Sequence, residues 1–116
     1  MLRLWRATIN SRNGLIFAIR SEQAVREELF VLLLAVPLAW VVGETIMRRV
    51  ELVAAVALVL VVELLNTAIE TLADHLSPEL HPQIRIVKDC AAAAVFVSVV
   101  GALVVAAALA VHLLHD

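Results

Sequence analysis

Several residue types that support common protein chemistry are scarce in this sequence of 116 residues. A single cysteine, Cys90, excludes a disulfide within the chain. Glycine occurs only at positions 14, 43 and 101, so no glycine-rich loop is available to cradle a phosphate. No Ser-His-acid or Cys-His arrangement is recognisable. The nine Lys and Arg side chains are too few for a nucleic-acid-binding face, and we expect no nucleic-acid partner.

What the sequence has in excess is apolar surface. Hydrophobic residues make up 63% of the chain and its mean hydropathy is +0.98, whereas soluble domains have roughly 45–50% apolar residues. A chain this short leaves much of its surface exposed when it folds. We therefore expect one domain, residues 1–116, that folds in lipid.

Three segments have the length and composition of membrane-spanning helices, which need roughly 20 apolar residues. They cover about 29–47, 50–73 and 91–111. Residues 1–28 alternate apolar side chains with arginines, which is typical of an amphipathic helix lying in the membrane surface. Ser11-Arg12-Asn13-Gly14 predicts a break within that helix, and two prolines in 77–83 end the middle span. The predicted fold class is all-α.

The distribution of basic residues predicts the orientation, because loops rich in Lys and Arg stay in the cytoplasm. Arg48 and Arg49 lie on one side of the predicted spans, and Arg85 and Lys88 lie on the other side. The segment before the first span belongs to this second side and holds five more: Arg3, Arg6, Arg12, Arg20 and Arg26. The amino terminus is therefore expected in the cytoplasm.

The middle span carries a polar stripe near its cytoplasmic end. Glu63, Asn66, Glu70 and Asp74 fall within an arc of about 80° at roughly 100° per residue. A carboxylate near the bilayer centre costs on the order of 2.5–3.5 kcal/mol, so such residues face a protein interior or a wet cavity. One chain with three helices has little interior, which indicates an oligomer.

Other polar groups allow both a functional and a structural interpretation. A membrane helix can keep polar residues to hold its neighbours, but the mutual repulsion of three acids favours a function for the stripe. Glu22 and Arg26 share a helix face as an ordinary juxtamembrane collar would, and Lys88 suits either an anchor or a phosphate contact. The patterns assign no role to His75, His81 or Cys90.

The gapless run from Glu63 through Asn66 to Glu70, followed by Asp74 and Lys88-Asp89, closely resembles the signature of the small integral-membrane diacylglycerol kinases of bacteria. Arg3, Gly14 and Glu22-x-x-x-Arg26-x-Glu28 agree with it. The resemblance implies a homotrimeric bundle with shared active sites in the bacterial inner (cytoplasmic) membrane. It also implies an ATP-dependent kinase that converts diacylglycerol into phosphatidic acid with Mg²⁺.

The same resemblance implies a role for each matching residue. Glu63 would be the general base, oriented by Asn66. Glu22 and Glu70 would hold Mg²⁺ on the ATP phosphates. The full ATP-binding set would be Arg3, Glu22, Glu70, Asp74, Lys88 and Asp89, and the lipid-binding set would be Glu63, Glu28 and Arg26.

Alternative functions stay open at this stage. His81-Pro82 and the run from Lys88 to Val95 resemble a sister branch that phosphorylates undecaprenol, whereas 12–15 and 22–28 resemble the diacylglycerol branch more. Buried glutamates also mark proton or ion transporters, although these acids crowd toward one membrane face. A purely structural membrane adaptor is a further alternative.

Overall fold

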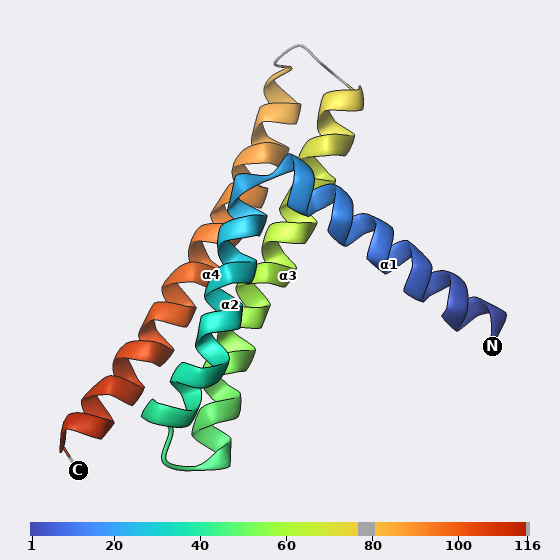
Figure 1. Ribbon diagram of the computed structural model, residues 1–116. Helices are drawn as coiled ribbons and strands as arrows, with labels where there is room; N and C mark the ends of the chain where they lie inside the picture. Colours follow the sequence, from blue (N-terminus) through green and yellow to red (C-terminus); the bar gives the residue numbers. More distant parts are fainter. Residues whose placement is uncertain (77–80, 116) are drawn as a thin grey trace.

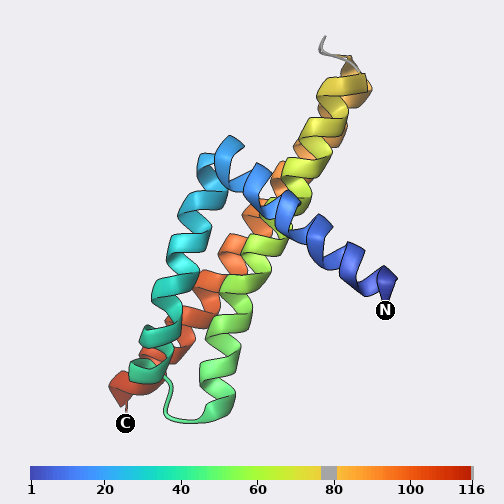
Figure 2. The ribbon, with the colours of Figure 1, turned by 45° about the vertical axis from the view of Figure 1, so that its right-hand side comes forward.

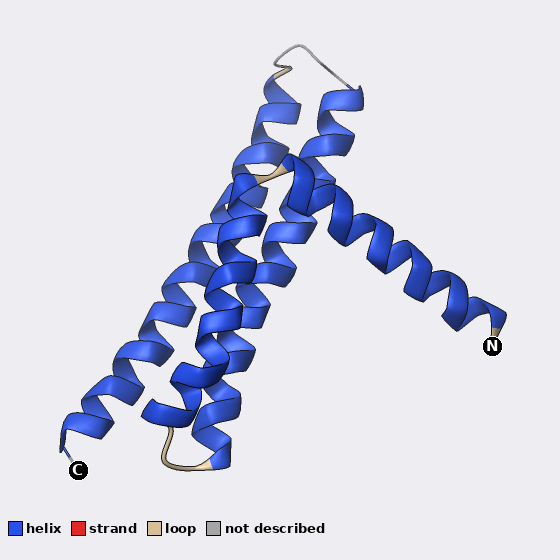
Figure 3. Cartoon of the chain, viewed as in Figure 1, coloured by secondary structure: helices blue, strands red, loops and turns tan. Residues whose placement is uncertain are grey.

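The computed structural model describes residues 1–76 and 81–115, and every regular element in these ranges is an α-helix (Figure 3). This confirms the prediction of an all-α fold. The helices are α1 (Leu2–Ser21), α2 (Gln23–Val42), α3 (Ile46–Leu76) and α4 (Pro82–His115).

Three of the helices form a bundle from which α1 projects. Helices α2, α3 and α4 lie side by side, and the two views show α1 leaving the start of α2 at an angle to the bundle (Figures 1 and 2). Helix α3 packs closely against both α2 and α4, while α2 touches α4 much less. The core is small and apolar, built from Ala35, Ala39, Leu52, Val56 and Leu109.

Two helices, α3 and α4, are long and apolar enough to cross a membrane. The predicted spans 50–73 and 91–111 each lie inside one of them. Helix α2 is shorter, and Arg26, Glu27 and Glu28 occupy its beginning. The corresponding span was predicted over 29–47, but the helix ends at Val42. That α2 also crosses the membrane therefore stays a prediction.

The turn between α2 and α3 depends on a glycine. A Cβ atom added to Gly43 would lie 2.8 Å from Ala39 O and 2.8 Å from Arg49 Cγ, so only glycine allows this close approach. Arg49 Nε donates to Gly43 O at 2.9 Å. The same guanidinium lies 4.0 Å above the Trp40 ring, a cation–π contact. These contacts fasten the two helices at the end opposite the polar stripe.

The predicted break at 11–14 is wrong, because α1 is continuous through Gly14. A glycine inside a helix lowers the stability of the helix by only about 1 kcal/mol relative to alanine, so the rest of α1 can stay helical around it. The chain instead breaks at Glu22, whose extended backbone (φ −122°, ψ 118°) separates α1 from α2. Helix α1 thus ends at Ser21, and residues 23–28, which the sequence analysis assigned to the predicted surface helix, belong to α2.

The start of α4 shows a role for a histidine to which the sequence assigned none. Pro82 is the first residue of the helix, a position where its missing N–H costs nothing. The His81 side chain accepts a hydrogen bond at Nδ1 from the Gln83 N–H at 3.2 Å and so caps the helix. Of the predicted turn 77–83, residues 77–80 lie outside the described residues.

Candidate active site

The centre of the site is Glu63, a carboxylate buried on α3 with only 7% of its surface exposed. The residues one, two and three turns before it on the same face are buried as well: Val59, Val56 and Leu52. The helix face that packs into the bundle therefore continues from apolar side chains directly into an acid. Within the described part of the chain, Glu63 Oε2 has no hydrogen-bond partner. An acceptor buried in this way needs a proton, a cation or a polar ligand.

The fold brings the two acidic clusters of the sequence together. Glu28, Glu22 and Glu70 all lie near enough to Glu63 to repel it electrostatically. Glu22 is the residue between α1 and α2, so the corner between these helices lies beside the acidic part of α3. Burial, and secondarily the neighbouring Glu27, raises the pKa of the Glu28 carboxyl above its ordinary value.

Asn66 lies beside the carboxylates on the same stripe. Its Nδ2 donates to Glu70 Oε1 at 3.5 Å, a long contact. Asn66 Oδ1 is the second buried oxygen that has no partner among the described residues. Two oxygen acceptors, from Glu63 and Asn66, are therefore available to a ligand on adjoining turns of one helix.

A cation is held at the Asp74 end of the stripe. Lys88 Nζ on α4 donates to Asp74 Oδ1 on α3 at 2.5 Å. The Asp74 side chain is 63% exposed, so water weakens the pair. Such a lysine can exchange its partner for a phosphate at little cost. Asp89 follows Lys88 on α4 and is exposed.

Two residues that were predicted to bind substrates, Arg26 and Arg3, have a different place or different contacts in the single chain. Arg26 donates through Nη1 to the carbonyl oxygens of Ile19 at 2.7 Å and Arg20 at 3.3 Å, and so caps the end of α1. Arg3 is in the first turn of α1, and the start of that helix lies away from the bundle (Figures 1 and 2). The single chain does not bring this end of α1 to the carboxylates.

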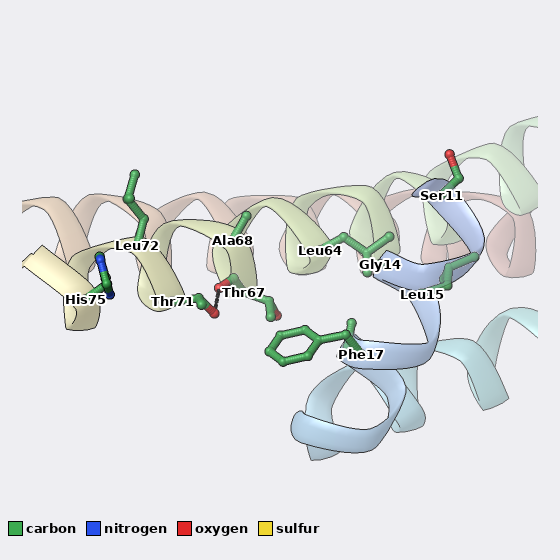
Figure 4. Close-up of a pocket in the computed structure, with 11 residues that line it drawn as sticks. Ser11, Gly14, Leu15, Phe17, Leu64, Thr67, Ala68, Thr71, Leu72 and His75 are labelled. Carbon is green, nitrogen blue, oxygen red and sulfur yellow. Dashed lines mark hydrogen bonds between the residues drawn. The ribbon is translucent and has the colours of Figure 1, made fainter. Parts of the chain in front are cut away.

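A groove of about 700 Å³ lies between α1 and the half of α3 that follows Glu63. Its walls are mostly apolar, and the Phe17 side chain extends from α1 toward Thr67 (Figure 4). Thr71 donates to Thr67 O at 2.7 Å along one edge, and His75 lies at the far end. Neither Phe17 nor His75 was assigned a role from the sequence, because a groove between separate helices leaves no local pattern.

No three or more His, Cys, Asp and Glu side chains within residues 1–76 and 81–115 are grouped closely enough to hold a metal ion. The available ligands are carboxylate and amide oxygens, the type that hard divalent cations prefer. Mg²⁺ usually takes one or two carboxylates together with substrate phosphates and water. The site fits such a shared ion better than a resident metal.

Comparisons with known proteins agree with this chemistry. The family described as prokaryotic diacylglycerol kinase matches residues 9–110. A protein named diacylglycerol kinase from Haemophilus influenzae is 35% identical over 98 residues, covering 84% of this chain and 83% of the relative. The protein of that name from Pseudomonas aeruginosa is 36% identical, covering 83% and 78%. The one from Escherichia coli K12 is 36% identical, covering 88% and 84%.

Proposed function

The chain belongs to the prokaryotic diacylglycerol kinase family and is a lipid kinase, and we propose that it transfers the γ-phosphate of ATP to diacylglycerol. The products are phosphatidic acid and ADP. The reaction takes place at the cytoplasmic surface of the bacterial inner membrane, where ATP meets the lipid. The observation that carries the proposal is the buried, unpartnered Glu63 oxygen among Glu22, Glu28 and Glu70.

Glu63 is the general base of the proposed mechanism. It accepts the proton of the lipid hydroxyl while the hydroxyl oxygen forms a bond to the γ-phosphorus and the bond to the β–γ bridging oxygen breaks. ADP leaves with the electron pair of that bond. Glu63 is suited to this role because its Oε2 is buried and has no hydrogen-bond partner within the described residues. Asn66 contacts Glu70 and keeps an oxygen available to orient the reactants.

Charge neutralisation is the second requirement of phosphoryl transfer. Glu22 and Glu70 are proposed to hold Mg²⁺ on the triphosphate, together with the nucleotide's own oxygens. When bound, the ion supplies positive charge to the phosphate oxygens. Lys88 adds a cation near Asp74, and both residues, with Asp89, are proposed to contact the nucleotide.

The membrane arrangement is part of the proposal. Three helices, α2, α3 and α4, span the bilayer with the amino terminus in the cytoplasm, and α1 lies in the membrane surface. The active protein is a homotrimer, which would let Arg3 at the far end of α1 reach a site on another copy. Helix α4 leaves apolar surface that either lipid or another copy can cover, since only 6% of its most apolar stretch is buried in one chain.

A two-lipid assay tests the proposed function. Purified protein in mixed micelles receives Mg²⁺, ATP labelled at the γ-phosphate, and either diacylglycerol or undecaprenol. We expect label in phosphatidic acid. Label only in the polyprenol would replace the substrate and keep the reaction. No label in either lipid, together with proton flux through liposomes without nucleotide, would make the protein a transporter.

A further inference from the structure

We propose that Phe17 of α1 closes over Thr67 of α3 as a seal that keeps water away from Glu63, so that phosphate is transferred to the lipid hydroxyl and not to water. This inference rests on the proposed function. The seal belongs to the groove of about 700 Å³ between α1 and α3. Phe17 and Thr67 both line this groove, and the Phe17 ring extends toward Thr67 (Figure 4).

The exposure of the side chains on α3 falls sharply at the residue that Phe17 faces. His75 and Thr71 line the groove and are exposed. One turn before Thr71, Thr67 is only 4% exposed, and one turn before that, Glu63 is only 7% exposed. Solvent in the groove therefore reaches Thr71 but is stopped at Thr67. The limit of solvent access on this helix thus lies one turn from the proposed base.

Thr67 lies between the groove and the polar stripe of α3. Four residues turn a helix by about 40° at roughly 100° per residue, so Thr67, Thr71 and His75 step progressively from the face of Glu63 toward the face of the groove. Asn66 and Glu70 lie on the other side of Glu63, and neither of them lines the groove. Thr67 is therefore the residue past which water from the groove would have to move to reach Glu63.

The hydroxyl groups at this point are bonded to the backbone of α3. Thr67 Oγ1 donates to Glu63 O at 3.0 Å, and Thr71 Oγ1 donates to Thr67 O at 2.7 Å. A buried hydroxyl that has such a partner does not need a water molecule. An aromatic ring can therefore cover Thr67 without leaving its hydroxyl unpaired. Ala18, next to Phe17, is 3% exposed, so this part of α1 is packed against the bundle.

Water must be excluded because ATP can also transfer its phosphate to water. In that reaction a water oxygen forms a bond to the γ-phosphorus, the bond to the β–γ bridging oxygen breaks, and Glu63 accepts a proton from the water. The products are ADP and inorganic phosphate. A closed site prevents this loss of ATP. Phe17 takes no part in the bonds that change, and it determines specificity by excluding the competing acceptor.

Substitutions of Phe17 test the proposal through the ratio of two reactions. Phe17→Ala removes the ring, and Phe17→Leu keeps a large apolar side chain. The matched control is Phe30→Ala, which changes a phenylalanine of α2 that is 62% exposed and does not line this groove. Release of inorganic phosphate from ATP is measured without diacylglycerol, and formation of phosphatidic acid is measured with saturating diacylglycerol.

We expect Phe17→Ala to raise ATP hydrolysis about tenfold or more, because the general base then acts on water, and to leave phosphatidic acid formation near the unsubstituted rate. Phe17→Leu and Phe30→Ala should leave both reactions unchanged. Unchanged hydrolysis in Phe17→Ala, or an equal rise in Phe17→Leu or Phe30→Ala, would overturn the proposal. So would a rise that persists when Phe17→Ala is combined with Glu63→Gln, since Glu63 would then not be the group that the seal protects.

A labelling measurement separates this inference from the proposed function. The exposed Cys90 is removed by Cys90→Ala, and Glu63→Cys places a single thiol at the buried position. Its reaction with a small water-soluble methanethiosulfonate should be about tenfold faster when Phe17→Ala is added, because a thiolate reacts only where the reagent has access. Equal rates would overturn the seal even where the unsubstituted protein is an active kinase. Faster labelling together with an unsubstituted protein that phosphorylates no lipid would keep the seal and remove the kinase.

Discussion

At the residue scale, the molecule keeps carboxylates where burial disfavours their charge. Glu63 is enclosed on α3, and Glu28 is partly buried on α2 beside it. Residues that exist only for stability would be replaced at little cost by apolar side chains of similar size. A ligand that neutralises them would explain why several acids lie at one point of a hydrophobic bundle.

Glu28 provides a prediction about pH. A carboxyl whose pKa is raised in the folded protein binds its proton more tightly there than in the unfolded chain, so its contribution to stability is lost as pH rises through the folded-state pKa. Glu28→Gln is therefore expected to raise Tm at pH 7. The gain should vanish below about pH 4.5, the ordinary value, where both states are protonated. Thermal unfolding in detergent at the two pH values measures this.

The same substitution should impair function. If Glu28 accepts a hydrogen bond from the lipid, Glu28→Gln raises the lipid KM about tenfold or more, because hydrogen bonds to charged groups are worth about 1.5–3 kcal/mol. The control is Glu51→Gln, an exposed acid of α3 far from Glu63. A Tm gain that persists at low pH, or an unchanged lipid KM, would contradict the assigned role.

Single side chains show how far the sequence predicts the site. The stripe of Glu63, Asn66 and Glu70 follows from helical periodicity alone, and it is found on one face. The pairing of Lys88 with Asp74 could not be read in this way, because it depends on how α4 lies against α3. Both residues were expected at the nucleotide, but nothing local indicated that they contact each other.

At the scale of elements, the corner between α1 and α2 positions Glu22 and Glu28. Arg26 holds this corner by donating to the last carbonyls of α1. The sequence suggested a break at 11–14 because Gly and Asn are common in turns, but tertiary contacts decide where a helix ends. Ala18, a few residues before Glu22, is the buried residue of α1 and anchors that end of it.

Arg26→Gln is expected to loosen α1 while the rest of the bundle stays intact. The shorter, uncharged side chain cannot reach both carbonyls, so the last turn of α1 loses its cap. Hydrogen–deuterium exchange should increase in residues 15–21 and stay unchanged in α3 and α4. Arg20→Gln, which keeps the accepting backbone carbonyl, is the control and should leave exchange in α1 as it is. Equal exchange in the two variants would exclude the proposed cap.

At the scale of the whole molecule, one chain leaves much apolar surface exposed. Its α3 bears the buried face of the bundle, but α4 remains apolar and exposed along most of its length. Composition predicted this excess of apolar surface and its need for lipid or further copies. Which faces meet lipid and which meet another chain could not be predicted, since both environments favour the same side chains.

The central claim is that the buried acid of α3 serves phosphate transfer to a lipid. The most direct test compares Glu63→Gln with Glu51→Gln, the same change at the other end of the helix, in bilayers with Mg²⁺, ATP and diacylglycerol. Loss of a general base predicts that kcat falls on the order of 10²–10⁴-fold in the first protein only. Turnover by Glu63→Gln at the rate of the Glu51→Gln control would contradict the account.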